Sequence, residues 1–451
     1  MKWLNLLSFQ RIGKTKSIAG NSDQIRSEFE RDYDRIIFSQ PFRSLQDKTQ
    51  VLPLPEDDFV HTRLTHSLET ASVGRSLGKM VGKVIVERHH LKEHNFSPLD
   101  FGSIVAAACL AHDVGNPPFG HSGEASISDF FKNDPSIKSI KENLNDAEWM
   151  DFTNFEGNAQ GFRILNDNKR YGITPTFATL CAFTKYPRES LFTSNNPQEK
   201  RASQKKFGFF QSEKPDFEAI ANEIGLLKRE GLGLSYSRHP LAFLVEAADN
   251  ICYHIIDLED GCRLGYIPYA TAEELIANIL KDDFKPEKLK SYTTEEEKIA
   301  VLRAIVINRL IAEISEVFLD LDDELLSGSY DKDFFTELPS KKALDGIISV
   351  SIESYYRSRR VLEIEASGYE VLGGLLRAFV LAAHNVFFSE NSTGRNKSVF
   401  KLLPKHIQLL SKDTPPYTLV QTCLDFITGL SDRASVSLYK KINGLELPGF
   451  S

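Results

Sequence analysis

The chain has 451 residues, of which 26% are charged and 41% are hydrophobic, and it contains 31 Phe and 14 Tyr. These aromatic residues exclude an intrinsically disordered chain, and 27 Gly with 19 Pro are too few for a collagen-like or low-complexity one. At about 150 residues per domain, the length predicts two or three domains. A net charge of −8 excludes the global basic excess of a dedicated nucleic-acid-binding protein, but leaves room for a local basic pocket.

The five cysteines are scattered and form no C-x-x-C pair, which excludes a zinc knuckle and a disulfide framework and predicts a reducing, cytoplasmic location. The N-terminal sequence M-K-W-L-N-L-L-S-F-Q-R has only a short apolar stretch, broken by Asn5, and no small-residue cleavage site. We therefore expect no signal peptide. Apolar runs such as 104–111 are far shorter than the roughly 18 residues of a membrane span, so no membrane contact is predicted.

Helical periodicity dominates the chain. Apolar residues at helical spacing predict a first helix over 66–90. Ser97-Pro98 opens a second helix, which is almost wholly apolar and therefore buried, and which ends at the G-N-P-P break of 115–118. A third helix is predicted from about 240 to 261. Further helices are predicted over 273–282, 294–320, 340–364 and 369–387.

Strand signals are few, so the predicted fold class is all-α with a minor β-hairpin. The hairpin is expected to include V-L-P-L-P at 51–55. Residues 190–235 are polar and rich in Lys, Asn, Gln and Gly, which predicts a loop-rich insertion or a mobile lid. The stretch 388–398 is predicted to be a second exposed loop.

Two histidines and two aspartates lie in or beside apolar helices: His66, His112, Asp113 and Asp249. Isolated charges are costly there unless they are paired or bound to a metal. Adjacent helical residues point about 100° apart, so His112 and Asp113 can reach one ion only where the backbone turns, and the break at 115–118 supplies that turn. We therefore predict that these four residues bind one metal ion.

A mixed imidazole and carboxylate ligand set suits Mn²⁺, Mg²⁺, Fe²⁺, Co²⁺ or Zn²⁺. Four protein ligands leave positions open for water and substrate on an octahedral ion, which is typical of a catalytic site. After the break, His121 and Glu124 are three residues apart and share a face if a helix begins there. We expect the Glu124 carboxylate to orient the His121 imidazole as a proton carrier.

Asp249, Tyr253 and Asp257 are spaced by four and line one face of the third predicted helix. A Tyr ring at this face can stack on a sugar, and a carboxylate can accept a hydrogen bond from a hydroxyl. Arg63 lies three residues before His66, and it is one of two basic residues, with Lys185, that we expect to face the site rather than solvent. The chain contains no G-x-x-x-x-G-K-[ST] loop, which argues against P-loop chemistry.

Three strings together resemble the HD-domain deoxynucleoside triphosphate triphosphohydrolases, and most closely the bacterial deoxyguanosine triphosphate triphosphohydrolases (dGTPases). They are H-T-R-L-T-H-S, A-H-D-V-G-N-P-P-F-G-H-S-G-E and E-A-A-D-N-I-C-Y. The resemblance extends over most of the chain, through P-F-R-S-L-Q-D-K-T-Q-V, N-F-E-G-N-A-Q-G-F-R-I-L, S-G-Y-E-V-L-G-G-L-L and D-F-I-T-G-L-S-D-R. It implies an HD-domain helical core with additional C-terminal helices.

The resemblance also implies a role for each matching residue. The metal ligands are His66, His112, Asp113 and Asp249, and the catalytic pair is His121 and Glu124. Gln46 matches a sugar-facing residue, Tyr253 and Asp257 match residues near the deoxyribose, and Glu365 matches a position near the guanine base. The residues that match phosphate-contacting positions are Arg63, Lys185 and Tyr186.

The implied reaction is hydrolysis of dGTP to deoxyguanosine and inorganic triphosphate, by attack of water at the α-phosphate, with Mn²⁺ or Mg²⁺ as the favoured metal. Whether His121 acts as base or acid stays open. Residues 1–270 are expected to form the catalytic core and 271–451 a helical region that completes the nucleotide pocket and the oligomer contacts. The family implies a homo-oligomer, often a hexamer, and in some members binding of single-stranded DNA.

Two other functions remain open from the residues. The same metal ligands serve HD phosphohydrolases that act on nucleoside monophosphates or cyclic nucleotides. The presence of Gln46, Arg63 and Lys185 disfavours this alternative, because a monophosphate needs fewer cations than a triphosphate. The other is a catalytically silent nucleotide-binding or nucleic-acid-binding regulator, which the presence of His121 and Glu124 disfavours.

Overall fold

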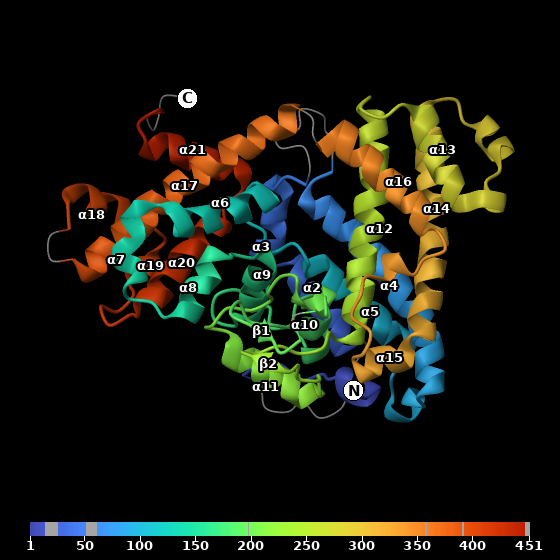
Figure 1. Cartoon of the computed structure of the whole chain (residues 1–451), viewed down its shortest axis with the longest axis horizontal. Helices are drawn as coiled ribbons and strands as arrows, with labels where there is room; N and C mark the ends of the chain where they lie inside the picture. The colour runs from blue at the N-terminus through green and yellow to red at the C-terminus, as the bar shows by residue number, and fades with distance from the viewer. Residues whose placement is uncertain (14–25, 51–60, 197, 357–358, 390–391, 447–451) are drawn as a thin grey trace.

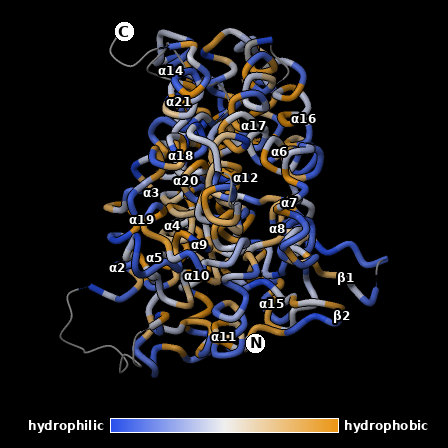
Figure 2. The backbone as a smooth tube through the Cα atoms, turned by 90° about the vertical axis from the view of Figure 1, so that its left-hand side faces the viewer, coloured by the Kyte–Doolittle hydropathy of each residue, from blue (hydrophilic) through white to orange (hydrophobic). Residues whose placement is uncertain are grey.

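A computed structural model describes residues 1–13, 26–50, 61–196, 198–356, 359–389 and 392–446. The protein is built almost entirely of helices, packed as two groups that lie side by side, each around its own hydrophobic cluster (Figure 1). Hydrophobic segments concentrate inside these groups, and hydrophilic ones lie mainly in the outer turns and loops (Figure 2). This confirms the predicted all-α class.

The first group contains the long central helices and the N-terminal segments, and its helices pack around the larger hydrophobic cluster. Its helices are α1 (Trp3–Leu6), α2 (Glu28–Ile37), α3 (Gln40–Arg43), α4 (Arg63–Arg88), α5 (Pro98–Ala111), α9 (Gly157–Asn166), α10 (Phe177–Phe183), α11 (Lys214–Ile224), α12 (Pro240–Arg263), α13 (Tyr269–Leu280), α14 (Glu295–Asp320), α15 (Asp322–Ser327) and α16 (Lys341–Ser351).

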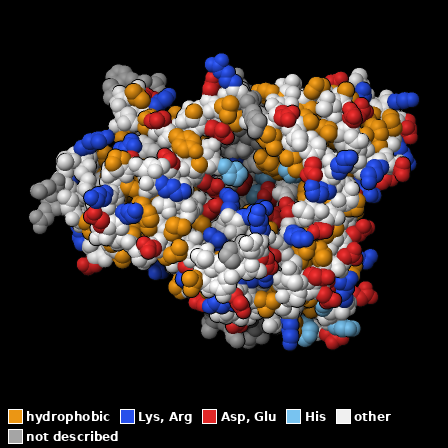
Figure 3. Space-filling view, in the orientation of Figure 1, with side chains coloured by type: hydrophobic (Ala, Val, Ile, Leu, Met, Phe, Trp, Pro, Cys, Tyr) orange, Lys and Arg blue, Asp and Glu red, His pale blue; other side chains and the backbone are white. Residues whose placement is uncertain are grey.

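The second group joins three helices from the first third of the chain to the C-terminal helices around a second hydrophobic cluster. It contains α6 (Gly120–Asn133), α7 (Lys138–Lys141), α8 (Asp146–Thr153), α17 (Arg359–Phe388), α18 (Gly394–Phe400), α19 (Lys405–Gln408), α20 (Pro416–Thr428) and α21 (Asp432–Ile442). The two clusters therefore do not follow the order of the chain, and a division at residue 270 stays a prediction. In the space-filling view, the face between the two groups is hollowed near its middle (Figure 3).

The antiparallel pair α4 and α5 forms the centre of the first group. Gly74, Gly78 and Gly82 on α4 face α5, and a Cβ atom at Gly78 would lie 2.6 Å from the carbonyl oxygen of Phe101. Only glycine permits this approach of the two backbones. Because the helices run in opposite directions, the start of α4 lies beside the end of α5. This brings His66 close to His112.

The turn after α5 is packed as tightly as the helices. A Cβ atom at Gly115 would lie 2.1 Å from both the carbonyl oxygen of Gly157 and the amide nitrogen of Gly161, so the chain after His112 rests directly on α9. The turn then enters α6 through Phe119 and Gly120, which both have positive φ angles, of 63° and 57°. The predicted break at 115–118 is confirmed.

The predicted helices agree with α4, α5, α12, α13 and α14, but the predicted boundary between 340–364 and 369–387 is wrong. One helix, α17, runs through this boundary, and the preceding helix α16 ends in a π-helical turn at Ile352–Tyr356. A single glycine, Gly368, costs a helix only about 1 kcal/mol. Its missing side chain lets Phe119 pack against α17, since a Cβ atom would lie 3.2 Å from that ring.

The segment 190–235 contains more regular structure than its composition predicts. It includes α11 and the antiparallel pair β1 (Thr193–Ser194) and β2 (Gly231–Leu232), which projects to one side (Figure 2). Phe207, Phe209 and Phe210 are buried, so this segment is anchored to the body. The predicted hairpin at 51–55 lies outside the described residues. Part of the predicted exposed loop at 388–398 forms the start of α18.

One described helix segment, Val361–Phe388, is long and apolar enough to cross a membrane by length and composition, with a mean hydropathy of 1.6 over its best window. Half of that window is buried inside the protein. The helix packs against α6, α18, α20 and α21. This packing is typical of the core helix of a globular protein.

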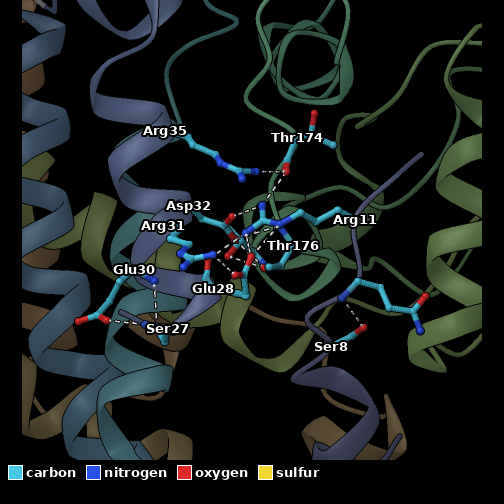
Figure 4. A network of polar contacts seen from close by, with 12 residues as sticks. Ser8, Arg11, Ser27, Glu28, Glu30, Arg31, Asp32, Arg35, Thr174 and Thr176 are labelled. Carbon is cyan, nitrogen blue, oxygen red and sulfur yellow. Dashed lines mark hydrogen bonds and ion pairs between the residues drawn. The ribbon is translucent and has the colours of Figure 1, made fainter. Parts of the chain in front are cut away.

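A buried ionic network fixes the N-terminal segment to the first group (Figure 4). The Arg11 guanidinium binds Asp32 on α2 and donates to the carbonyl oxygen of Thr174 at 2.7 Å. The second Asp32 oxygen accepts hydrogen bonds from the amide and the hydroxyl of Thr176, at 2.9 and 2.6 Å. Both charges are satisfied, so their burial is tolerated.

Asp151 predicts a pH dependence of stability. It accepts hydrogen bonds from Ser190, Gln211 and Tyr417, and burial raises its pKa from 3.8 to about 7. Between these values the folded state binds more protons than the unfolded state, so the free energy of unfolding falls as pH rises from about 4 to 7. We expect the melting temperature of the wild type, relative to that of Asp151→Asn, to decrease between pH 5 and pH 8.

The exposed Asp146 on the same helix provides the control, since Asp146→Asn should follow the wild-type pH profile. A constant difference between the wild type and Asp151→Asn across this pH range would contradict the prediction.

Candidate active site

Four side chains predicted to bind a metal converge at one point of the first group. Ligand atoms of His66, His112 and Asp113 lie within 4.8 Å of one another. The Asp249 Oδ1 atom lies 3.2 Å from Nε2 of His66 and 3.5 Å from Nε2 of His112. The structure therefore brings together residues that are up to 183 positions apart in the chain.

The local structure explains how each donor is presented. His66 lies in the first turn of α4, His112 is the residue after the last turn of α5, and Asp249 lies on α12. The Nδ1 atom of His112 is 2.6 Å from the carbonyl oxygen of Cys109, so it carries the proton. Its Nε2 atom then presents a lone pair to the cluster, as in metal-binding histidines whose second nitrogen is held by an acceptor.

Two cations keep both carboxylates ionised. Burial alone would raise the pKa of Asp113, but the Arg63 guanidinium, 2.7 Å away, is the main group that lowers it, to about 2. Burial would likewise raise the pKa of Asp249, but Lys185, at 2.9 Å, is the main group that holds it well below its ordinary value. Ionised carboxylates and a neutral imidazole nitrogen are the forms that bind metal.

This donor set fits a divalent ion. Two imidazole nitrogens and two carboxylates within a few ångströms have the composition of a catalytic rather than a closed structural metal centre. The four residues supply the donors, and the open side of the cluster faces a cavity.

That cavity, here named the polar cavity, has a volume of about 310 Å³. Three of the four cluster residues line it: His112, Asp113 and Asp249. A second cavity of about 190 Å³, here named the side cavity, shares Gln50, Arg63, His121 and Tyr253 with it. The two cavities are therefore contiguous. Histidine, acidic and basic side chains gather in the hollow at this position (Figure 3).

His121 and Glu124 both reach the polar cavity, but the expected contact between them is not formed. The Glu124 oxygens accept hydrogen bonds from the Gly157 amide at 2.7 Å and from Lys206 at 3.3 Å. Within the described ranges the His121 side chain makes no hydrogen bond or ion pair. The Glu124 carboxylate is instead bound by the start of α9 and by Lys206.

Most of the other predicted residues lie at the two cavities. Lys185 and Tyr186 line the polar cavity, Glu365 lines the side cavity, and Arg63 and Tyr253 line both. Asp257 lies behind this surface, because its carboxylate is almost fully buried and accepts a hydrogen bond of 2.6 Å from Tyr356. The Tyr356 ring stacks on that of Tyr253, so two tyrosines separate Asp257 from the cavity.

The structure does not bring Gln46 into the site, because this side chain is exposed and lines neither cavity. Gln50, four residues later, lines both cavities, and its Oε1 atom is buried without a hydrogen-bond partner. The segment S-L-Q-D-K-T-Q contains both glutamines, and its sequence does not distinguish them. Only the path of the chain after the short helical turn at Ser44–Asp47 selects Gln50.

Sequence reasoning also missed Lys206, which lies in the polar segment 190–235, where a lysine carries no distinguishing signal. Its ammonium group lines the polar cavity between Glu124, at 3.3 Å, and Glu156, at 2.9 Å. Burial and the nearby Glu124 raise the pKa of Glu156 to about 7. Lys206 adds a third cation, beside Arg63 and Lys185, to the wall of this cavity.

Comparison with known proteins agrees with this geometry. The HD domain family matches residues 63–152, which include three of the four cluster residues but not Asp249. A deoxyguanosinetriphosphate triphosphohydrolase-like protein of Synechocystis sp. is 39% identical over 99% of this chain and 100% of its own length. One of Pseudomonas aeruginosa is 37% identical over the same shares.

The deoxyguanosinetriphosphate triphosphohydrolase of Salmonella enteritidis is 31% identical over 82% of this chain and 80% of its own length. Such identity over most of both chains, together with the convergent His and Asp cluster, assigns the family. The chain belongs to the HD-domain deoxyguanosinetriphosphate triphosphohydrolase-like proteins.

Proposed function

We propose that this protein hydrolyses dGTP to deoxyguanosine and inorganic triphosphate by attack of water at the α-phosphate. The observation that carries the proposal is the contiguity of a metal-binding cluster, three cations and a second cavity around Arg63 and His121. The printed names of the relatives support dGTP among the nucleotides.

We assign His66, His112, Asp113 and Asp249 as ligands of one divalent ion, with Mn²⁺ or Mg²⁺ favoured and Fe²⁺, Co²⁺ or Zn²⁺ as alternatives. When bound, the ion supplies Lewis acidity at the α-phosphate. Arg63, Lys185 and Lys206 then neutralise the negative charge of the triphosphate, and Tyr186 provides a hydroxyl in the same cavity.

His121 is the proton carrier in this proposal. It faces both cavities and has no partner among the described residues, so it is free to receive a proton from the attacking water or to give one to the departing 5′-oxygen. Glu124 acts at a distance from it, by holding the Gly157 amide and Lys206 in place.

The side cavity accommodates the nucleoside. Gln50 reaches the sugar hydroxyl with its free amide oxygen, and the Tyr253 ring, supported by Tyr356 and Asp257, leaves little room for a 2′-hydroxyl. Glu365 offers a carboxylate at the far wall, which suits the N–H donors on the Watson–Crick edge of guanine.

We further propose a cytoplasmic homo-oligomer, with a hexamer favoured, in which residues 271–451 complete the nucleotide pocket and supply contacts between subunits. Binding of single-stranded DNA is a further property of this proposal, and it requires a local basic surface, because the net charge is −8.

The ligand assignment predicts one high-affinity Mn²⁺ site per chain. Replacing His112 by Ala removes a first-sphere donor, so we expect a loss of Mn²⁺ affinity of about 100-fold or more, since even outer partners contribute 10- to 100-fold. Isothermal titration calorimetry and electron paramagnetic resonance measure this. His121→Ala is the matched control and should bind Mn²⁺ as the wild type does, while equal affinity of His112→Ala and wild type would refute the assignment.

The reaction is tested by incubating the protein with each of the four dNTPs and Mn²⁺ in H₂¹⁸O and resolving the products. We expect deoxyguanosine and triphosphate from dGTP, with the label in triphosphate, because water attacks phosphorus rather than carbon. Asp113→Ala should abolish turnover. Release of dGMP with pyrophosphate, turnover of monophosphates or cyclic nucleotides alone, or binding without turnover would each reject the proposal.

Base recognition is tested with Glu365→Gln. Glutamine keeps the shape but loses the charge and one acceptor that would face guanine, so we expect kcat/KM for dGTP to fall at least about tenfold relative to that for dATP. The control is Glu363→Gln on the same helix, whose side chain is 61% exposed and pairs with Arg359. An unchanged ratio of dGTP to dATP in Glu365→Gln would exclude this role.

A further inference from the structure

Three segments that are distant in the sequence meet beneath the two cavities: residues 48–49, 116–119 and 428–432. The buried Lys48 ammonium donates to the carbonyl oxygens of Asn116 and Thr428, at 2.6 and 2.7 Å. In return, Asp432 accepts the amide of Thr49 at 3.1 Å with one oxygen and the amide of Phe119 at 3.0 Å with the other. Each segment is thereby bound to the other two.

Asp432 is the centre of this junction. It is fully buried at the start of α21, and within the described ranges its side chain forms no ion pair. A buried carboxylate is costly unless its oxygens are satisfied. Here both oxygens accept hydrogen bonds from backbone amides, and Lys48 and Arg63 both supply compensating positive charge.

The two amides that Asp432 holds lie one and two residues before functional residues. Thr49 is followed by Gln50, and Phe119 is followed by Gly120 and His121. Phe119 has a φ of 63°, a left-handed conformation that a residue with a side chain rarely adopts unless surrounding contacts impose it. A Cβ atom at Gly120 would lie 2.5 Å from the Arg63 guanidinium, so the path of the chain here also sets the spacing between His121 and Arg63.

We propose that Asp432 is a positioning residue, which acts through the Thr49 and Phe119 amides to hold Gln50 and His121 on opposite walls of the shared cavity. It touches neither the metal ligands nor the cavities. The C-terminal helices thereby contribute to catalysis by fixing segments 48–49 and 116–119, of which the second lies within the residues matched by the HD domain family. The effect on turnover rests on the proposed function, but the effect on the two loops does not.

The competing explanation is that Asp432 only stabilises the fold, for example as an acidic residue in the first turn of α21. Asp425 on α20 provides a matched control. It is also a buried carboxylate of the C-terminal helices, and it binds Gln160 at 2.8 Å and Arg163 at 2.9 Å, but it contacts neither segment 48–49 nor segment 116–119. Loss of its charge removes stability without releasing those two segments.

The experiment compares Asp432→Asn with Asp425→Asn in the full-length protein. The asparagine side chain has only one acceptor oxygen, and its NH₂ group faces the second backbone N–H without accepting from it. One of the two segments therefore loses its hydrogen bond. We expect faster hydrogen–deuterium exchange at the Thr49 and Phe119 amides, Mn²⁺ affinity within threefold of wild type, and a fall in kcat of about 10- to 100-fold, as small misplacements produce. Asp425→Asn should show none of these changes at a comparable loss of melting temperature.

Unchanged exchange at Thr49 and Phe119 in Asp432→Asn would overturn the proposal, and so would equal losses of kcat in both variants. If the wild type turns over no dNTP, the proposed function fails, and the exchange data alone decide whether Asp432 holds the two loops. If Asp432→Asn does not fold, Asp432→Glu keeps the charge and both acceptors on a stem longer by one methylene. It should fold and lose several-fold in kcat, whereas full wild-type kcat in Asp432→Glu would reject the positional requirement.

Discussion

The close approach of α4 and α5 is the constraint on which the rest of the site depends. Three glycines spaced by four let the two backbones come so near that a single Cβ atom at Gly78 would clash with the Phe101 carbonyl. The helices are antiparallel, so this contact fixes the start of one beside the end of the other, and their imidazoles meet with ring centroids 5.2 Å apart. A metal ligand set needs placement within a fraction of an ångström, which rigid helices provide better than loops.

The buried carboxylates of the cluster are also stabilised by ion pairs. The cluster gathers two carboxylates in a buried setting, and each is matched by one cation from a different part of the chain: Arg63 for Asp113, and Lys185 for Asp249. These cations lower the pKa of each carboxyl, so both stay ionised. The same two cations line the polar cavity, which is the space that we propose for the triphosphate. One set of charges thus serves both the folded state and the proposed substrate.

The candidate site takes residues from both groups of helices and from parts of the chain well beyond the matched HD domain. The residues matched by the HD domain family end at 152, yet Lys185, Lys206 and Asp249 lie beyond that point, and Glu365 reaches the side cavity from α17. The turn at 116–119 passes from the first group to the second. Asp432 of α21 accepts its Phe119 amide, and the Lys48 ammonium links its Asn116 carbonyl to the carbonyl of Thr428 on α20. The site is therefore formed at the boundary between two hydrophobic clusters, which gives it one wall from each.

The sequence by itself determined the helical class, the approximate extents of α4, α5 and α12, and the four residues of the His and Asp cluster, because helical periodicity and costly buried polar groups leave a local signal. It did not determine which glutamine enters the site, the partner of Glu124, or the course of α17 past Gly368. The path of the chain after a short turn places Gln50 rather than Gln46 at the cavity. Glu124 accepts hydrogen bonds from the start of α9 and from Lys206, which lie elsewhere in the chain. The ring of Phe119 packs against α17 at Gly368. Each of these depends on contacts between segments far apart in the sequence, and such contacts exist only once the chain is folded.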